Sequence, residues 1–209
     1  MTSSRSNRAK LCICADDFGQ HKGVNDAVLR LAGMGRLHAV GALVGAPAWK
    51  SGTGTLRRLD AEGIDVGLHL DLTEFPQLPG VRRPLGRLIA HAVLHRLDRI
   101  RVRAEIRAQL DVFESALGHG PSFIDGHQHV HQLPGVRDEL LAELDDRYGG
   151  YLPWIRCTRA VSMSGLASRA DARSRLKGLI IEWVGAHGLR IAARRHGFGQ
   201  NGRLLGVYD

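Results

Sequence analysis

Short apolar runs alternate with amphipathic stretches along most of this chain. Five runs of β-forming apolar residues have the composition of strands that are buried on both faces. They lie at residues 11–15, 39–44, 66–70, 122–125 and 154–158, and a further run begins at 204–207. Between them, apolar residues at helical spacing predict helices over residues 24–36, 56–61, 85–96, 102–117, 136–147 and most of 168–196. The repeated strand-then-helix order predicts an α/β protein with a parallel sheet and helices outside it.

The size of the chain and its connections indicate a single domain. With 209 residues it can bury one sizeable core, and it holds no internal repeat, low-complexity tract or interdomain linker. We therefore assign residues 11–209 to one domain and residues 1–10 to a disordered leader, because the leader has no cleavable apolar region. Residues 73–84 contain three prolines and a glycine, which predicts a long loop with a functional role.

Composition favours a cytoplasmic protein with no membrane span and no specific nucleic-acid partner. No apolar run is long enough to cross a bilayer. The three cysteines are an odd number without a C-x-x-C pair, which indicates small buried thiols rather than a disulfide framework. The formal net charge is +8, but arginines such as Arg99, Arg103 and Arg107 alternate with apolar positions at helical spacing. We expect solvated helix faces here, and an affinity for polyanions stays open.

Three polar stretches lie at the carboxyl ends of predicted strands. Asp16 and Asp17 follow the first predicted strand, His69 lies near the end of the third, and D-G-H-Q-H-V-H at 125–131 follows the fourth. Because the carboxyl ends of parallel strands meet at one edge of a sheet, these side chains are expected to gather there. The histidines of the cluster, His127, His129 and His131, alternate, so an extended backbone would aim all three to one side. Each stretch alone has an ordinary structural explanation, such as a turn, a cap or a core histidine.

Together the stretches offer a donor set for one divalent metal. Asp17, His69 and one histidine of the cluster would supply one oxygen and two nitrogens, and three protein ligands with an open position are typical of a catalytic site. Asp16 would stay free to accept a proton from water, since two ligating carboxylates would leave no base. The chain has no G-x-S-x-G nucleophile elbow and no phosphate-binding or dinucleotide-binding glycine motif. A metal-dependent hydrolase is therefore the leading hypothesis.

At these residues the chain resembles the YdjC-like family of carbohydrate deacetylases, which includes chitooligosaccharide deacetylases and relatives from hopanoid biosynthesis. The resemblance covers about residue 11 to at least residue 160, and the matching segments keep their order and spacing. They are A-D-D-F-G at 15–19 with Gly23 and Asn25 after it, L-V-G-A-P-A at 43–48, G-L-H-L-D-L-T at 67–73 and D-G-H-Q-H-V-H-Q-L-P-G at 125–135.

The resemblance implies a fold, an activity and a set of roles. The fold would be a distorted (β/α) barrel of the glycoside hydrolase and deacetylase type. The enzyme would hydrolyse a linear amide, removing the N-acetyl group from an amino sugar that is chitooligosaccharide-like or linked to a glycolipid. It would use Mg²⁺ or Zn²⁺, with Asp17, His69 and His127 as metal ligands and Asp16 as the general base. His129 and His131 would line the pocket or orient the ligands.

The chain departs from the family pattern near its C-terminus. It contains no His-Pro pair, whose histidine is thought to protonate the leaving amine in the family. We therefore expect His131 to act as the acid, a domain that lacks the last barrel strand or strands, and an exposed sheet edge that favours a homodimer. Two alternatives stay open. One is a catalytically impaired relative that binds a glycan or polyanion, and the other is a metal-dependent hydrolase of another ester or amide.

Overall fold

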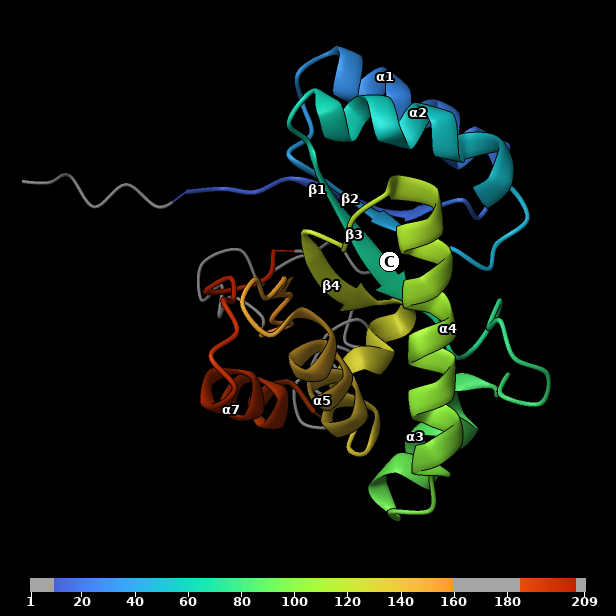
Figure 1. The fold of residues 1–209 in the computed structure, drawn as a ribbon, viewed down its shortest axis with the longest axis vertical. Helices are drawn as coiled ribbons and strands as arrows, with labels where there is room; N and C mark the ends of the chain where they lie inside the picture. Colours follow the sequence, from blue (N-terminus) through green and yellow to red (C-terminus); the bar gives the residue numbers. More distant parts are fainter. Residues whose placement is uncertain (1–9, 160–184, 206–209) are drawn as a thin grey trace, which may run out of the picture.

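The computed structural model describes residues 10–159 and 185–205, drawn in colour in Figure 1. Residues 1–9 of the predicted leader, most of the predicted helix over 168–196 and the end of the strand predicted at 204–207 lie outside the described residues. Within the described ranges, no helix has the length and apolar character needed to cross a membrane.

The core of the structure is a five-stranded parallel sheet. In chain order the strands are β1 (Cys14–Phe18), β2 (Ala39–Ala42), β3 (Asp65–Leu70), β4 (Phe123–Gly126) and β5 (Trp154–Ile155). Their order in space is the same as their order in the sequence, and each strand is parallel to the next. A parallel bridge from Ile155 to Gln200 continues the sheet beyond β5. This sequential parallel order is the arrangement of a β/α barrel wall, which confirms the predicted fold class.

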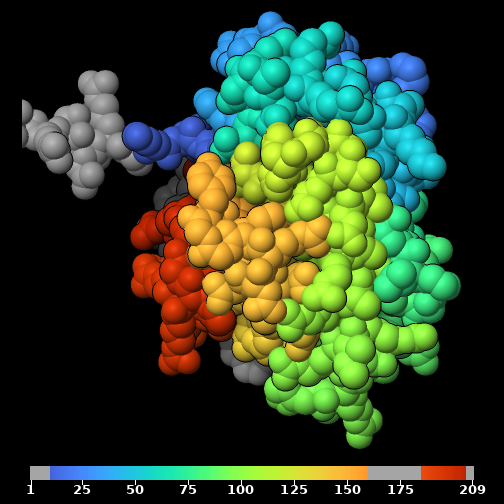
Figure 2. All heavy atoms as spheres, in the orientation of Figure 1, coloured from blue at the N-terminus to red at the C-terminus, as the bar shows by residue number. Residues whose placement is uncertain are grey.

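Helices connect the strands and cover the sheet. They are α1 (Lys22–Gly33), α2 (Trp49–Ala61), α3 (Leu85–Val93), α4 (Arg99–Leu117), a 3-10 segment η1 (His127–Gln132), α5 (Val136–Tyr148) and α7 (His187–Arg195). In Figure 1, α1 lies beside α2, α4 runs along the sheet, and α5 lies beside α7. In the space-filling view of this face, residues of the helices hide the strands (Figure 2).

Two predicted elements are shifted in the structure. The first strand was expected at 11–15, but β1 begins at Cys14 and continues through both aspartates to Phe18. Helix α2 begins at Trp49, seven residues before the predicted start at residue 56. The prediction began too late because Gly52 and Gly54 interrupt the apolar pattern of the first turns. Gly52 is buried, and a Cβ at this position would lie 2.7 Å from Asn25 and from Phe18. The glycine therefore permits close packing of α2 on α1 and β1.

Three arginines of α4 form ion pairs with the neighbouring helix α5. Arg99 lies 2.6 Å from Glu139 of α5, and Arg103 and Arg107 both reach Glu143 of α5. Arg99 and Arg107 are exposed, in agreement with the predicted solvated helix faces, and Arg103 is half-buried. All three also join α4 to α5 through ion pairs.

The prediction of small buried thiols holds for Cys157 only. Cys157 is buried, Cys14 is half-buried and Cys12 is exposed. Cys12 is exposed because the chain enters the sheet only at Cys14, so Cys12 precedes β1 and lies outside the core.

Candidate metal centre

An irregularity in β1 brings two adjacent carboxylates to one site. Ala15 pairs with Val40 and Phe18 with Ala42, so β1 has one more residue than β2 between the two pairs. Asp17 occupies this interval with a φ of 62°, in the left-handed region that residues other than glycine rarely adopt. Successive side chains of a regular strand point to opposite faces, and a bulge of this kind changes that direction. The bulge therefore lets both Asp16 and Asp17 reach the groups at the end of the sheet.

Asp17 lies between two imidazoles that arrive from different elements. Its Oδ1 is 2.8 Å from Nδ1 of His127, the first residue of η1, and 3.3 Å from Nε2 of His69 on β3. The ligand atoms of Asp17, His69 and His127 all lie within 4.8 Å of one another. One carboxylate oxygen and two imidazole nitrogens suit a divalent metal such as zinc. The three residues expected to share an ion are thus close enough to do so.

Arg156 organises the other side of the site. It follows β5, and its two terminal nitrogens each donate to one oxygen of Asp16 at 2.7 Å. The same guanidinium lies 2.7 Å from Oδ2 of Asp125, whose Oδ1 is 2.7 Å from Nδ1 of His69. Because Arg156 already supplies a cation between Asp16 and Asp125, the group of Asp16, His69 and Asp125 is a poor second metal site. The donor set of Asp17, His69 and His127 fits a metal better.

His69 joins the two halves of the site through its two ring nitrogens. Nδ1 faces the buried Asp125 and Nε2 faces Asp17. A histidine whose Nδ1–H donates to a carboxylate has Nε2 free to bind a metal, and the carboxylate fixes the orientation of the ring. Asp125 is thus suited to hold His69 in the tautomer that a ligand needs.

Glycine forms the floor of this half of the site. A Cβ on Gly41 of β2 would lie 3.4 Å from both Asp16 Oδ1 and His69 Nδ1, and 3.5 Å from Asp125 Oδ1. A larger side chain on Gly41 would occupy the space where these three polar groups meet. The small residue therefore leaves room for the network above β2.

The metal-free site holds protons on its imidazoles. Burial by itself lowers the pKa of His69, but the carboxylates of Asp125, Asp17 and Asp16 outweigh it and raise the pKa to about 10. The pKa of His127 is also raised, since the carboxylates of Asp17 and Glu74 overcome the effect of burial. The pKa of Asp17 is lowered, because its contacts with both imidazoles overcome the opposing effect of burial.

Metal binding near neutral pH is therefore expected to release protons. A ligating imidazole must be neutral, and His69 keeps its proton in the folded, metal-free protein up to about pH 10. Metal affinity should rise with pH up to that value, about tenfold per pH unit for each proton displaced. Titration calorimetry of Zn²⁺ at pH 7, in buffers of different ionisation enthalpy, measures the protons released. Release of none, with an affinity independent of pH, would exclude His69 as a ligand.

The histidine cluster is not extended, so the prediction that its three side chains share one side is wrong. Its backbone turns into η1, with φ values of 52° at Gln128 and 60° at His129. His127 reaches the site, His129 is half-buried, and His131 is completely buried. Nε2 of His131 donates to the carbonyl of Arg156 at 3.0 Å. His131 thus lies beneath the site and supports the backbone of Arg156.

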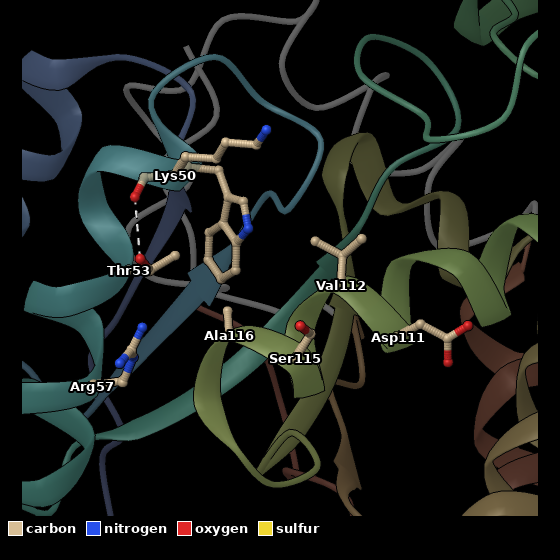
Figure 3. A pocket seen from close by; sticks show the side chains of 8 residues that line it. Lys50, Thr53, Arg57, Asp111, Val112, Ser115 and Ala116 are labelled. Atoms are coloured by element: carbon tan, nitrogen blue, oxygen red, sulfur yellow. Dashed lines mark hydrogen bonds between the residues drawn. The ribbon is translucent and has the colours of Figure 1, made fainter.

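A separate hollow lies on the outside of the sheet between α2 and α4. It has a volume of about 450 Å³, and Lys50, Thr53, Arg57, Asp111 and Ser115 are among its lining residues. Figure 3 shows these side chains, with the hydroxyl of Thr53 donating to the carbonyl of Lys50. The lining contains one carboxylate and no histidine, so it offers no metal site. The chemistry of the described residues is concentrated at the strand ends instead.

Sequence reasoning missed Asp125 and Arg156 as members of the site. Asp125 stands in the D-G-H segment directly before His127, and a buried acid beside predicted ligands is a usable signal. Arg156 follows a predicted strand end in W-I-R-C-T, the same address that singled out the aspartates and histidines. Both could have been found by examining every polar residue at a strand end.

Comparison with known proteins points to one family. The model of the family described as YdjC-like protein matches residues 10–206. A carbohydrate deacetylase of Mus musculus is 32% identical over 176 residues, which are 78% of this chain and 54% of that protein. A chitooligosaccharide deacetylase of Enterobacter sp. (strain 638) is 31% identical over 145 residues, 66% of this chain and 56% of that protein. The chain thus spans about half the length of these relatives.

A solved structure supports the fold. A protein of Enterococcus faecalis V583, named for cellobiose-phosphate cleavage, superposes with a TM-score of 0.57 at 22% identity. The likeness covers 83% of this chain and 64% of that one, and at this identity it concerns the fold alone. The family match extends over nearly the whole chain and includes every residue of the site described above. The chain therefore belongs to the YdjC-like protein family.

Proposed function

We propose that this chain carries the active site of a metal-dependent hydrolase that removes the N-acetyl group from an amino sugar. The observation that carries the proposal is the convergence of Asp17, His69 and His127, with the carboxylate of Asp16 held beside them by Arg156. Relatives named carbohydrate deacetylase and chitooligosaccharide deacetylase supply the substrate class. The scarcity of aromatic residues, 5% of the chain, favours a short acceptor over a long stacked glycan.

The metal ligands in this proposal are Asp17, His69 and His127. Two imidazoles and a carboxylate suit zinc, while the family resemblance allows magnesium equally. When bound, the metal supplies a Lewis acid that polarises the acetyl carbonyl and lowers the pKa of water.

Asp16 is the proposed general base. Its carboxylate is half-exposed, so water can reach it, while the two hydrogen bonds from Arg156 fix its orientation. Holding a base in one geometry removes an entropic cost from the proton transfer. Asp16 accepts the proton of the attacking water, and Arg156 acts as a positioning residue for it.

The proton donor for the leaving amine was predicted to be His131. Burial lowers the pKa of His131 to about 3, and its side chain has no exposed surface. These properties favour a supporting role over acid catalysis: His131 holds the backbone of Arg156, which in turn binds Asp16. His129, which is half-buried in the same segment, is the better candidate for contact with a substrate.

Acetate release from small N-acetylated sugars tests the proposed function. The protein is incubated with N-acetylglucosamine and its dimer and trimer, with added Zn²⁺, Mg²⁺ or Mn²⁺, and an aryl phosphate serves as the alternative substrate. We expect acetate from at least one sugar, and loss of that activity on chelation. Sugar binding without acetate at any metal concentration would indicate a non-hydrolysing glycan-binding relative. Turnover of the phosphate ester alone would change the reaction class.

A further inference from the structure

The long loop after β3 delivers a carboxylate to the outer side of His127. Glu74 is the fourth residue after β3, and its Oε1 lies 3.2 Å from Nε2 of His127. The opposite ring nitrogen, Nδ1, faces Asp17 at 2.8 Å. Glu74 belongs to neither of the two groups that could hold a metal among the described residues, so it lies beyond the ring rather than in the ligand set.

Glu74 is placed to do for His127 what Asp125 does for His69, although at 3.2 Å it forms an ion pair and not the aligned hydrogen bond that joins Asp125 to His69. A neutral imidazole that binds a metal through one nitrogen carries its proton on the other, and that N–H needs an acceptor. His69 has Asp125 for this purpose at 2.7 Å. His127 has Glu74, so each candidate imidazole ligand has a carboxylate behind it.

The loop is built to hold Glu74 in this place. The buried carboxylate of Asp71 accepts hydrogen bonds from the backbone N–H groups of Thr73, Glu74 and Phe75, at 2.6 to 3.2 Å. A flexible loop would not sustain a fixed contact with His127, because ordering its backbone costs about 1–2 kcal/mol per residue. The Asp71 contacts fix the backbone on both sides of Glu74.

Helix α4 supplies a second anchor for the same loop. Glu105 is fully buried, and its two oxygens accept from the N–H groups of Gln77 and Leu78 at 2.7 and 2.8 Å. Gln109 donates to Glu105 and also to the carbonyl of Asp71, both at 2.6 Å. These two side chains of α4 therefore tie the loop to the end of β3.

A glycine allows the loop to approach the neighbouring connection. A Cβ on Gly45, which lies between β2 and α2, would be 1.8 Å from the carbonyl oxygen of Phe75. Any larger residue would push the loop away from the site. This close approach explains why the L-V-G-A-P-A segment has a glycine at position 45, although that residue takes no part in the metal site.

We propose that Glu74 is a positioning residue that fixes the ring of His127 for metal binding, and that Asp71, Glu105 and Gln109 hold it there. The inference rests on the proposed metal site, and it adds a role for the loop that none of the predicted site residues covers. Loss of a carboxylate that orients a metal-binding histidine typically weakens metal affinity by about 10–100-fold.

Metal affinity, rather than turnover, tests this role. The dissociation constants of Zn²⁺ and Co²⁺ are measured by chelator competition for the full chain and for Glu74→Ala, Glu74→Gln and the control Glu62→Ala. Glu62 is an exposed acid whose nearest cation is 3.8 Å away. We expect Glu74→Ala to bind about 10–100-fold more weakly. Glu74→Gln should recover most of the loss because its amide oxygen can accept from Nε2 once the metal fixes the proton there, and the control should match the wild type.

Hydrogen exchange separates positioning from a loss of loop structure. The amides of Thr73 and Phe75 are bound by Asp71, so Glu74→Ala should leave their protection unchanged. Unchanged affinity in Glu74→Ala would overturn the proposal. An equal loss in Glu74→Gln would overturn it too, and so would a loss of affinity accompanied by loss of amide protection. If the wild type binds metal but releases no acetate, the proposed activity fails while this role stands.

Discussion

Replacing Asp16 by asparagine is expected to lower kcat for an N-acetylated sugar by about 10²–10⁴-fold, the usual contribution of a positioned general base. Asparagine has nearly the same shape, and its remaining oxygen can still accept from Arg156. It cannot accept the proton of water, so turnover falls while binding of substrate and metal persists. The measurements are kcat under saturating substrate and the metal content of the purified variant.

A matched exposed aspartate controls for the loss of one negative charge. Asp26 lies on α1, where it pairs with Lys22 at the surface. Asp26→Asn should therefore keep the wild-type kcat. Wild-type turnover in Asp16→Asn would assign the base to another group, whereas loss of metal in that variant would make Asp16 a ligand.

Replacing Arg156 by leucine is expected to lower the free energy of unfolding by about 3–5 kcal/mol, the usual cost of leaving a buried charge without its partner. The side chain of Asp125 is 1% exposed and that of Arg156 is 7% exposed, so water cannot replace the guanidinium. The control is Arg58→Leu, which removes an exposed pair at 3.8 Å and should cost at most about 1 kcal/mol. Urea unfolding of the metal-free protein at pH 7 measures both variants.

The pH dependence of the Arg156→Leu defect identifies its cause. Burial tends to raise the pKa of Asp125, but His69 and Arg156 hold it at about 2 in the folded protein. A depressed carboxyl pKa contributes stability above the unfolded value of about 3.9, and this contribution is lost as pH falls towards 2. The gap between wild type and Arg156→Leu should therefore narrow as pH falls from 5 towards 3. A gap that does not change with pH would assign the loss to packing instead of charge.

The strands were predictable because their signal is local. Parallel strands that are covered on both faces need short apolar runs, and each of the five runs in this sequence became a strand. The bulge in β1 carries no such signal, since alternation along a strand would send Asp16 and Asp17 to opposite faces. The residue types also give no sign of the left-handed backbone at Gln128 and His129, because neither residue is glycine. The turn that separates the three histidines therefore could not be predicted.

The donor set was predictable, and the partners that orient it were not. Metal ligands are limited to a few residue types, so Asp17, His69 and the histidines of residues 127–131 stand out as candidates, and the family resemblance selects His127 among them. The residues that orient these candidate ligands are ordinary charged residues. They lie far along the chain from the ligands that they orient, so the sequence does not show that they belong to the same site. Arg156 is 140 positions from Asp16, and β1 and β5 stand at opposite ends of the strand order, so the sheet must curve to bring the two residues together.

The extra residue in β1 serves the proposed site and not the pairing of β1 with β2. Deleting one position between Ala15 and Phe18 would restore uninterrupted pairing with β2 and relieve the left-handed backbone at Asp17. Because Asp16 and Asp17 are the two positions in that interval, the same deletion would remove either the proposed base or the proposed metal ligand. A variant with a regular β1 should thus have a more stable sheet and lack the proposed activity.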